Sequence, residues 1–219
     1  MKITVVGATG RIGELVVHRA NAAGHDVTAV VRRPDAISGV ARVVTADLAH
    51  PSAAALAAAV AGADAVLSCL GARTRKDAGI VAPGTRALIA AMNEMGVRRI
   101  VTISASPVST VPSPGRRNPP PDPGLTGSLR IITPVIKRVF ASVYADLARM
   151  EDELRFSDLD WTAIRPPRLT DKPGTGAFRT AHEHNLPGGS AVSRADVADL
   201  MLRVVEQPET FGHAIHIAA

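Results

Sequence analysis

The sequence predicts an α/β protein whose core is a doubly wound parallel sheet, and three observations carry that prediction. Short β-branched runs alternate with helix-like stretches through the first half of the chain. Three glycines, Gly7, Gly10 and Gly13, stand between the first strand-like run and the first helix-like stretch. A further glycine follows each of the early helix-like stretches, where a left-handed cap is favoured. Strand, helix and strand repeated at this length favour parallel strands joined by right-handed crossovers.

The first element is an apolar, β-branched run at residues 3–6, long enough for a buried strand. The helix behind it begins near Gly10 and directs free backbone N–H groups at whatever anion lies over the turn. The three glycines suit a tight turn, a close approach of backbone to a ligand, and close packing of helix on strand. We expect a dinucleotide-binding turn here, and the alternative is a tight turn that binds nothing.

The later elements follow in order along the chain. Strands are expected at residues 26–31, 42–46, 65–70, 99–104, 161–165 and 214–218, with an extended stretch at 177–183. Helices are expected at residues 52–61, 84–95 and 135–156, and a last one to about residue 206 from a capping box at Ser193. A sheet of this kind binds its ligand at the carboxyl ends of its strands.

Residues 107–134 break this regularity because they are rich in proline and glycine. Such a segment cannot form one helix or an inner strand. A loop of this length inside a compact domain is usually a lid or a mobile insertion. We expect a partly ordered flap near the active cleft, and the alternative is a disordered surface insertion.

Length and composition fit a single domain, placed at residues 1–219, with small C-terminal elements on the substrate side. The chain is 46% hydrophobic and 21% charged, and no apolar run reaches the length of a membrane span. We expect no secretory signal and no membrane association, and the single cysteine, Cys69, fits a reducing cytoplasm. A net charge of +5 with only 3% aromatic residues favours an anionic small molecule over nucleic acid as partner. We expect a monomer or a weak dimer.

The end of the second expected strand carries the residues that would select a cofactor. In NAD enzymes an acidic residue stands there and binds the adenosine ribose, but the nearby Asp26 lies at the start of the strand. The carboxyl end reads V-V-R-R-P instead. A planar, permanently charged guanidinium suits a 2′-phosphate, so Arg32, helped by Arg33, predicts NADP(H). A solvated arginine pair is the alternative.

Several motifs together resemble one known family. They are G-A-T-G-R-I-G near the start, V-R-R-P after the second strand, A-D-L at 46–48, S-C-L-G-A-R at 68–73, M-E-D-E-L-R-F-S-D-L-D-W-T-A-I-R-P-P-R-L-T-D at 150–171, and S-R-A-D-V-A at 193–198. They resemble the atypical short-chain dehydrogenase/reductases, specifically the NAD(P)H-binding NmrA-like group and its flavin reductase/biliverdin-IXβ reductase branch. The resemblance covers nearly the whole chain apart from the proline-rich insertion and implies a Rossmann fold.

The resemblance also implies a set of cofactor-binding positions. Those around the pyrophosphate are Gly7, Thr9, Gly10, Arg11 and Ile12, with Gly13 completing the motif; Arg32 and Arg33 would bind the 2′-phosphate, Asp47 and Leu48 would flank the adenine, Leu70, Gly71 and Arg73 would pass beside the cofactor, and Ser104, Ser106, Pro166, Pro167 and Leu169 would lie by the nicotinamide.

The family's usual catalytic pair is missing. Typical short-chain dehydrogenases use Tyr-x-x-x-Lys, in which the lysine lowers the tyrosine pKa, but Tyr144 is followed four residues later by Ala148. We therefore expect Tyr144 to be a packing or pocket residue, with general acid as the minority interpretation. Ser104 and Ser106 could hydrogen-bond the nicotinamide amide or the substrate, and capping of the strand end is the alternative. These three residues are the catalytic candidates.

No other motif competes with this interpretation. His182 and His184 would share one face of a strand, but two ligands without a third predict no metal site. Cys69 within an apparent strand is more often a small core residue than a nucleophile.

The sequence therefore predicts an NADPH-dependent reductase of a planar acceptor such as a flavin or quinone, which can take hydride without a matched proton donor. The first alternative is a redox sensor that binds the dinucleotide, performs no chemistry and regulates a partner protein. A sugar-nucleotide epimerase or dehydratase ranks last because it needs the Tyr-x-x-x-Lys pair.

Overall fold

The computed structural model describes residues 1–34, 37, 39–71, 78–125 and 127–219. Its strands are β1 (Lys2–Val6), β2 (Asp26–Val31), β3 (Arg42–Thr45), β4 (Ala65–Ser68), β5 (Arg99–Ile103), β6 (Asp160–Arg165), β7 (Arg168–Thr170), β8 (Arg179–His182), β9 (Ala191–Ser193) and β10 (His213–Ala218). Its α-helices are α1 (Arg11–Ala22), α2 (Ala53–Val60), α3 (Val81–Met95), α4 (Gly127–Val139), α5 (Ala141–Arg155) and α6 (Arg194–Arg203).

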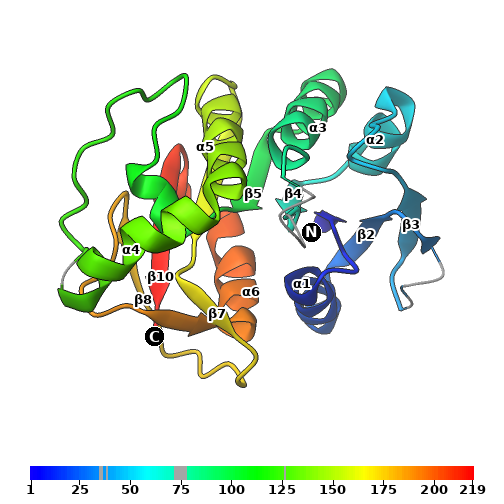
Figure 1. Ribbon diagram of the computed structural model, residues 1–219. Coiled ribbons are helices and arrows are strands. Elements are labelled where there is room, and N and C mark those ends of the chain that lie inside the picture. The colour runs from blue at the N-terminus through cyan, green and yellow to red at the C-terminus, as the bar shows by residue number, and fades with distance from the viewer. Residues whose placement is uncertain (35–36, 38, 72–77, 126) are drawn as a thin grey trace.

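An eight-stranded sheet in the order β3-β2-β1-β4-β5-β6-β10-β8 runs through the molecule (Figure 1). All neighbouring strands pair in parallel except β8, which pairs antiparallel with β10 at the edge. The chain moves outward from β1 to β2 and β3, then returns to the other side of β1 at β4. This reversal beside β1 is the switch point at which such sheets bind ligands, so the predicted doubly wound fold is confirmed.

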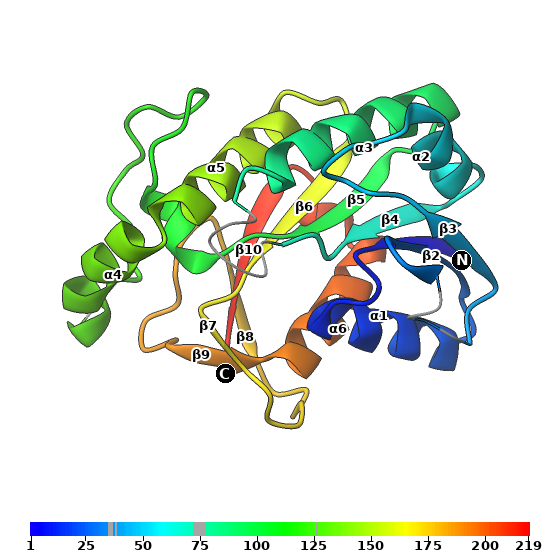
Figure 2. The ribbon, with the colours of Figure 1, turned by 45° about the vertical axis from the view of Figure 1, so that its right-hand side comes forward.

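Helices cover both faces of the sheet (Figure 2). One core packs α2, α3 and α5 on the sheet, and the other packs α1 and α6 on its opposite face. Strand β1 serves both cores by alternation, because Val6 points into the first and Val5 into the second. Helix α4 lies outside both layers (Figure 2).

The helix expected at residues 135–156 is two helices, and this part of the sequence prediction is wrong. Helix α4 begins at Gly127, inside the proline-rich segment, and contains Pro134. Phe140, at φ −111° and ψ 28°, separates it from α5. Pro134 has no backbone N–H, so α4 lacks one hydrogen bond of its interior ladder.

The described part of the proline-rich segment is held by two carboxylates. Asp152 of α5 accepts hydrogen bonds from Ser113 Oγ and the Gly115 N–H, each at 2.9 Å. Asp122, within the segment, accepts from the backbone N–H groups of Gly124 and Asn185. None of the segment's described residues lines the main cavity, so its role as a flap stays a prediction.

The sequence did not predict the small parallel pair β7 and β9, which lies beside the carboxyl ends of the sheet. The last predicted helix is confirmed as α6, where Ser193 Oγ accepts from the Asp196 N–H at 2.9 Å.

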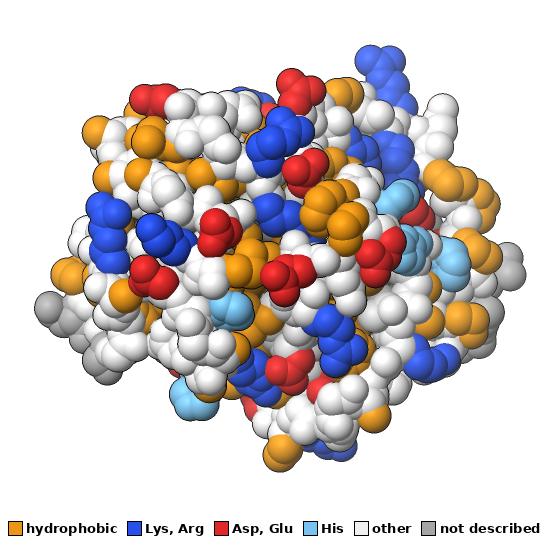
Figure 3. Space-filling view, turned by 180° about the vertical axis from the view of Figure 1, so that it is seen from behind, with side chains coloured by type: hydrophobic (Ala, Val, Ile, Leu, Met, Phe, Trp, Pro, Cys, Tyr) orange, Lys and Arg blue, Asp and Glu red, His pale blue; other side chains and the backbone are white. Residues whose placement is uncertain are grey.

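The face behind Figure 1 carries acidic and basic side chains interspersed with apolar ones (Figure 3). In the described part of the chain, no helix is long and apolar enough to cross a bilayer.

Candidate functional site

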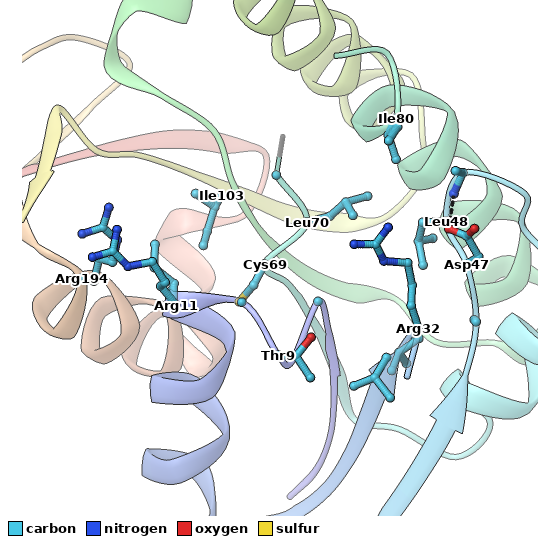
Figure 4. A pocket seen from close by; sticks show the side chains of 18 of the residues that line it. Thr9, Arg11, Arg32, Asp47, Leu48, Cys69, Leu70, Ile80, Ile103 and Arg194 are labelled. Carbon is cyan, nitrogen blue, oxygen red and sulfur yellow. Dashed lines mark hydrogen bonds between the residues drawn. The ribbon is translucent and has the colours of Figure 1, made fainter. Parts of the chain in front are cut away.

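A cavity of about 710 Å³ lies at the switch point, over the carboxyl ends of β1, β2 and β4 (Figure 4). Eleven of the residues predicted to bind a cofactor line it: Gly7, Thr9, Gly10, Arg11, Ile12, Arg32, Asp47, Leu48, Leu70, Gly71 and Leu169. Three segments far apart in the sequence, at the ends of β1, β2 and β4, therefore converge as the resemblance implies.

The glycine turn is shaped by steric limits at each glycine. Gly7 has φ +72°, and a Cβ there would lie 3.0 Å from the Cys69 carbonyl oxygen. A Cβ on Gly13 would lie 2.2 Å from the Gly7 carbonyl oxygen, so this glycine permits the close packing of α1 on the turn. Gly10 lines the cavity and its N–H donates to the Gly7 carbonyl at 2.9 Å. Gly13 does not line the cavity, and its role is packing.

The N-terminus of α1 differs from those of the other helices around it. Gly10 caps α1 with no side-chain hydrogen bond. At α3, by contrast, buried Asp146 of α5 accepts from the backbone N–H groups of Gly79, Val81 and Ala82 at 2.8–3.1 Å. At α6 the Ser193 side chain caps the first turn. The donors of α1 are thus available to an anionic ligand in the cavity.

Arg32 follows β2 and lines the same cavity, opposite Leu48 and Asp47 (Figure 4). The Ala49 backbone N–H donates to Asp47 Oδ1 at 3.1 Å and is the main cause of the lowered pKa of that carboxyl, to which Arg32 also contributes. Arg33 is exposed and does not line the cavity. Both arginines are exposed and follow the end of β2, where the chain bends at Arg32, and only Arg32 lines the cavity.

A second pair of arginines lies at the other side of the cavity from Arg32 (Figure 4). Arg11 begins α1, and Arg194 begins α6. Both form ion pairs with the same carboxylate, that of Asp171, and the Arg194 Nη1 to Asp171 Oδ1 distance is 2.7 Å. Arg11 is one of the predicted cofactor-binding residues, whereas Arg194 is not.

Cys69 lies just beyond β4 and lines the cavity, so its expected place inside the strand is wrong. Burial raises the pKa of its thiol to about 12. The thiol is therefore neutral at physiological pH, which argues against a nucleophile.

The two serines expected at the nicotinamide end do not line this cavity. Ser104 is buried and its hydroxyl donates to Glu151 Oε1 at 2.7 Å. The Ser106 hydroxyl donates to the Arg165 carbonyl at 3.0 Å. Because a serine has one proton to donate, each hydroxyl offers only its remaining lone pairs to a ligand. Pro166 and Pro167 also lie outside the residues that line the cavity, and Arg73 lies outside the described residues.

A buried polar network extends from Ser104 across the sheet. Fully buried Arg165 binds fully buried Glu151 with two nitrogens, including a 2.8 Å bond from Nε to Oε1. Another Arg165 nitrogen faces His216 Nε2 at 3.3 Å, and His216 Nδ1 lies 3.2 Å from Asn185 Oδ1. The guanidinium can only donate, so we assign the histidine proton to Nδ1, which donates to Asn185.

Burial and the Arg165 charge determine the protonation states of Glu151 and His216. Burial would raise the pKa of Glu151, but the Arg165 guanidinium outweighs burial and holds it at about 2. Burial, together with Arg165, lowers the pKa of His216 to about 3. Glu151 is therefore ionised and His216 neutral across the physiological range, and neither group exchanges a proton near neutral pH.

Tyr144 does not line the cavity either. Its ring packs in the core that contains α5, with the Phe140 ring centroid at 6.1 Å. Burial raises its pKa above the ordinary value. The prediction of a packing role agrees with this position.

A protein-family model described as NAD(P)H-binding matches residues 7–208 of the chain. The chain belongs to this NAD(P)H-binding family. The model matches from Gly7 onward, so it includes the turn, the cavity and both arginine groups. Nicotinamide dinucleotide binding is thereby established, and the preference for NADPH stays a prediction.

The chain is similar to several known proteins and solved structures. Residues of the chain are 38% identical over 106 positions to uncharacterized protein Rv2047c of Mycobacterium tuberculosis, covering 48% of the chain and 12% of that protein. The chain is 30% identical over 169 residues to a Streptomyces 3-diazoavenalumate denitrifying reductase, covering 67% of the chain and 54% of that protein. ChuY, an anaerobilin reductase of Escherichia coli O157:H7, shares the fold. Its own alignment has a TM-score of 0.77 at 22% identity and covers 100% of the chain and 97% of ChuY.

The cavity fits the cofactor that the family binds. A Cβ on Gly7 or Gly10 would lie 3.0–3.1 Å from backbone oxygens of the protein, so these glycines permit the tight turn that lines the cavity. The first-turn N–H groups of α1 and the Arg11 guanidinium supply positive charge there.

Proposed function

We propose that this protein is an NADPH-dependent oxidoreductase that delivers hydride to a planar acceptor such as a flavin or quinone. The observation that carries the proposal is the cavity at the switch point, which joins the glycine turn, the uncapped α1 and Arg32. Family membership supports the cofactor, and two of the similar proteins are named reductases. The motifs that resemble the flavin reductase/biliverdin-IXβ reductase branch support the acceptor class.

Arg32 supports the choice of NADPH over NADH. Its side chain lines the cavity beside Asp47 and Leu48, where the resemblance assigns the adenosine end of the cofactor. Within the described residues it has no carboxylate partner at ion-pair distance, so its charge is available. A guanidinium binds a 2′-phosphate through charge-assisted hydrogen bonds that the NADH ribose cannot form.

Bound NADPH would supply the hydride. The chain's own residues would bind the cofactor through the turn at Gly7 and Gly10, through α1 and Arg11, and through Arg32. Ile103 and Leu169 present apolar side chains to the cavity and would exclude water from it. The Ser104 and Ser106 hydroxyls already donate hydrogen bonds, to Glu151 and to a backbone carbonyl.

The proposed acceptor is therefore one that needs no proton from a side chain whose pKa is adjusted for proton transfer. Tyr144 has a raised pKa and lies outside the cavity, and neutral Cys69 is a poor acid at pKa about 12. Flavins and quinones can accept hydride and take their proton from water.

The test is steady-state NADPH oxidation with flavins, quinones and tetrapyrroles as acceptors. We expect turnover with at least one planar acceptor, at a rate proportional to enzyme concentration. As a control, a Gly13→Val variant should lose NADPH binding and turnover together, because the added side chain meets the Gly7 backbone. NADPH binding without oxidation by any acceptor would contradict the reductase.

A second function, a redox sensor that binds NADP(H) without chemistry, is favoured by one observation. Ser104, Ser106 and Tyr144, the three catalytic candidates, all lie outside the residues that line the cavity. A sensor would bind NADPH and NADP⁺ with clearly different affinities and leave every acceptor unreduced.

A further inference from the structure

Arg194 is the charged residue of the cavity that the proposed cofactor site leaves without a role. It begins α6 and lines the cavity near Arg11, on the side away from Arg32 (Figure 4). Its side chain is only 17% exposed. The apolar side chains of Ile103 and Leu169 line the same cavity. A cation beside apolar surface suits a ring system that carries an anionic substituent.

The ion pairs around Arg194 leave one positive charge unbalanced. Arg11 and Arg194 share the single carboxylate of Asp171. That carboxylate is 62% exposed and does not line the cavity. Pairs to an exposed carboxylate are weak, so an incoming oxyanion can compete with Asp171 for either guanidinium.

A serine side chain caps the N-terminus of α6. Ser193 Oγ accepts from the Asp196 N–H, and Asp196 Oδ1 accepts from the N–H groups of Thr175 and Gly176. The cap thus satisfies the Asp196 N–H, and the positive charge that α6 presents to the cavity is the Arg194 guanidinium.

We propose that Arg194 binds an oxyanion, a phosphate or carboxylate, carried by the planar acceptor, so that the acceptor is an acid. This inference rests on the proposed reductase function. The α1 N-terminus and Arg11 serve the pyrophosphate and Arg32 serves the 2′-phosphate, which leaves Arg194 for the second substrate. The guanidinium then selects between acceptors that share a ring system and differ only in charge.

FMN and riboflavin provide the direct test, because they share one ring system and differ by a phosphate. Each is titrated by flavin fluorescence onto the protein saturated with NADP⁺, so that no turnover occurs. We expect the wild type to bind FMN at least about tenfold more tightly than riboflavin. Arg194→Gln should reduce that ratio to within about threefold and leave riboflavin affinity unchanged.

Lys172→Gln is the matched control. It removes the same charge from the residue next to Asp171, but Lys172 is exposed and does not line the cavity. This variant should keep the preference for FMN. Menadione and a naphthoquinone that carries a carboxylate form a second acceptor pair, which shows whether charge rather than the flavin ring decides the preference.

Two results would overturn the inference. One is equal affinity of the wild type for the charged and neutral member of both pairs. The other is an Arg194→Gln variant that binds NADPH at least tenfold more weakly while it keeps the preference for FMN, because Arg194 would then belong to the cofactor site. Failure of the reductase itself is distinguishable, since NADPH would then be oxidised by none of the four acceptors.

Discussion

Along the carboxyl edge of the sheet, the polar groups at β1 and β2 differ from those at β5 and β6 in whether they already have partners. At β1 and β2, the α1 N–H groups and the Arg32 guanidinium face a cavity of about 710 Å³. At β5 and β6, Ser104, Glu151 and Arg165 satisfy one another in the interior. Both regions contain arginines and hydroxyls, but among the described residues the donors at β1 and β2 are the ones left available to a ligand.

This difference shows how a polar group's partners decide its role. A buried guanidinium that is already paired with a carboxylate stabilises the fold, and its removal leaves an uncompensated charge. A guanidinium that lines a cavity without a carboxylate partner is available for binding. The comparison therefore predicts large effects on stability at one end and on cofactor selection at the other.

The largest expected effect is at Glu151. Glu151→Ala should lower the free energy of unfolding by about 3–5 kcal/mol, because buried Arg165 loses its carboxylate partner. Urea denaturation followed by circular dichroism measures it. Glu153→Ala, on the same helix, breaks the exposed pair with Arg86 and should cost less than about 1 kcal/mol. Equal effects of the two variants would mean that the buried pair contributes no more to the free energy of unfolding than the exposed pair.

A smaller effect is expected from His216 on acidification. The folded state keeps His216 neutral down to a pKa of about 3, whereas the unfolded chain takes up a proton below its ordinary pKa of 6.5. Stability is therefore lost as the pH falls, by about 2 kcal/mol between pH 7 and pH 5. Glu151 adds its own loss only below its ordinary pKa of 4.5.

The variant His216→Gln tests whether His216 causes this loss of stability. Its amide can accept from Arg165 and donate to Asn185, as the imidazole does, but it does not titrate. We expect the urea midpoint of this variant to change much less than that of the wild type between pH 7 and pH 5. Parallel curves for the two proteins would show that His216 is not the group responsible.

The smallest effect is expected at Tyr144. Its ring packs beside Phe140 and lies outside the cavity, so Tyr144→Phe should change acceptor turnover only a few-fold. Steady-state kinetics with saturating NADPH measures this change. A loss of three orders of magnitude, with folding and NADPH affinity intact, would assign a proton-transfer role to the hydroxyl.

The sequence predicted the ligand-facing region at β1 and β2 well because local patterns encode it. The turn at Gly7, the strand β2 and the position of Arg32 follow from spacing along the chain. The buried polar network at β5 and β6 depends on contacts between distant segments, such as Arg165 with His216, which no local pattern encodes. In the sequence Arg194 is only a neighbour of the Ser193 cap, because its place in the cavity comes from tertiary packing.

The helices after residue 126 show the same limit. Pro134 favours a helix that starts after it, yet α4 contains this proline, so the loss of one backbone hydrogen bond does not by itself exclude proline from a helix. No local pattern predicts the cap of α3, since Asp146 comes from α5 rather than from the residues before the helix.

The most direct test of the central claim is a set of NADPH and NADH titrations on the wild type and on Arg32→Ala, at one salt concentration. Charge-assisted bonds to the 2′-phosphate predict a wild-type preference for NADPH of roughly one to three orders of magnitude. Arg32→Ala should remove most of that preference and leave NADH affinity nearly unchanged, while Arg33→Ala, whose side chain lies outside the cavity, should remove less. Equal wild-type affinity for NADPH and NADH would contradict the account and return Arg32 to the role of a solvated charge.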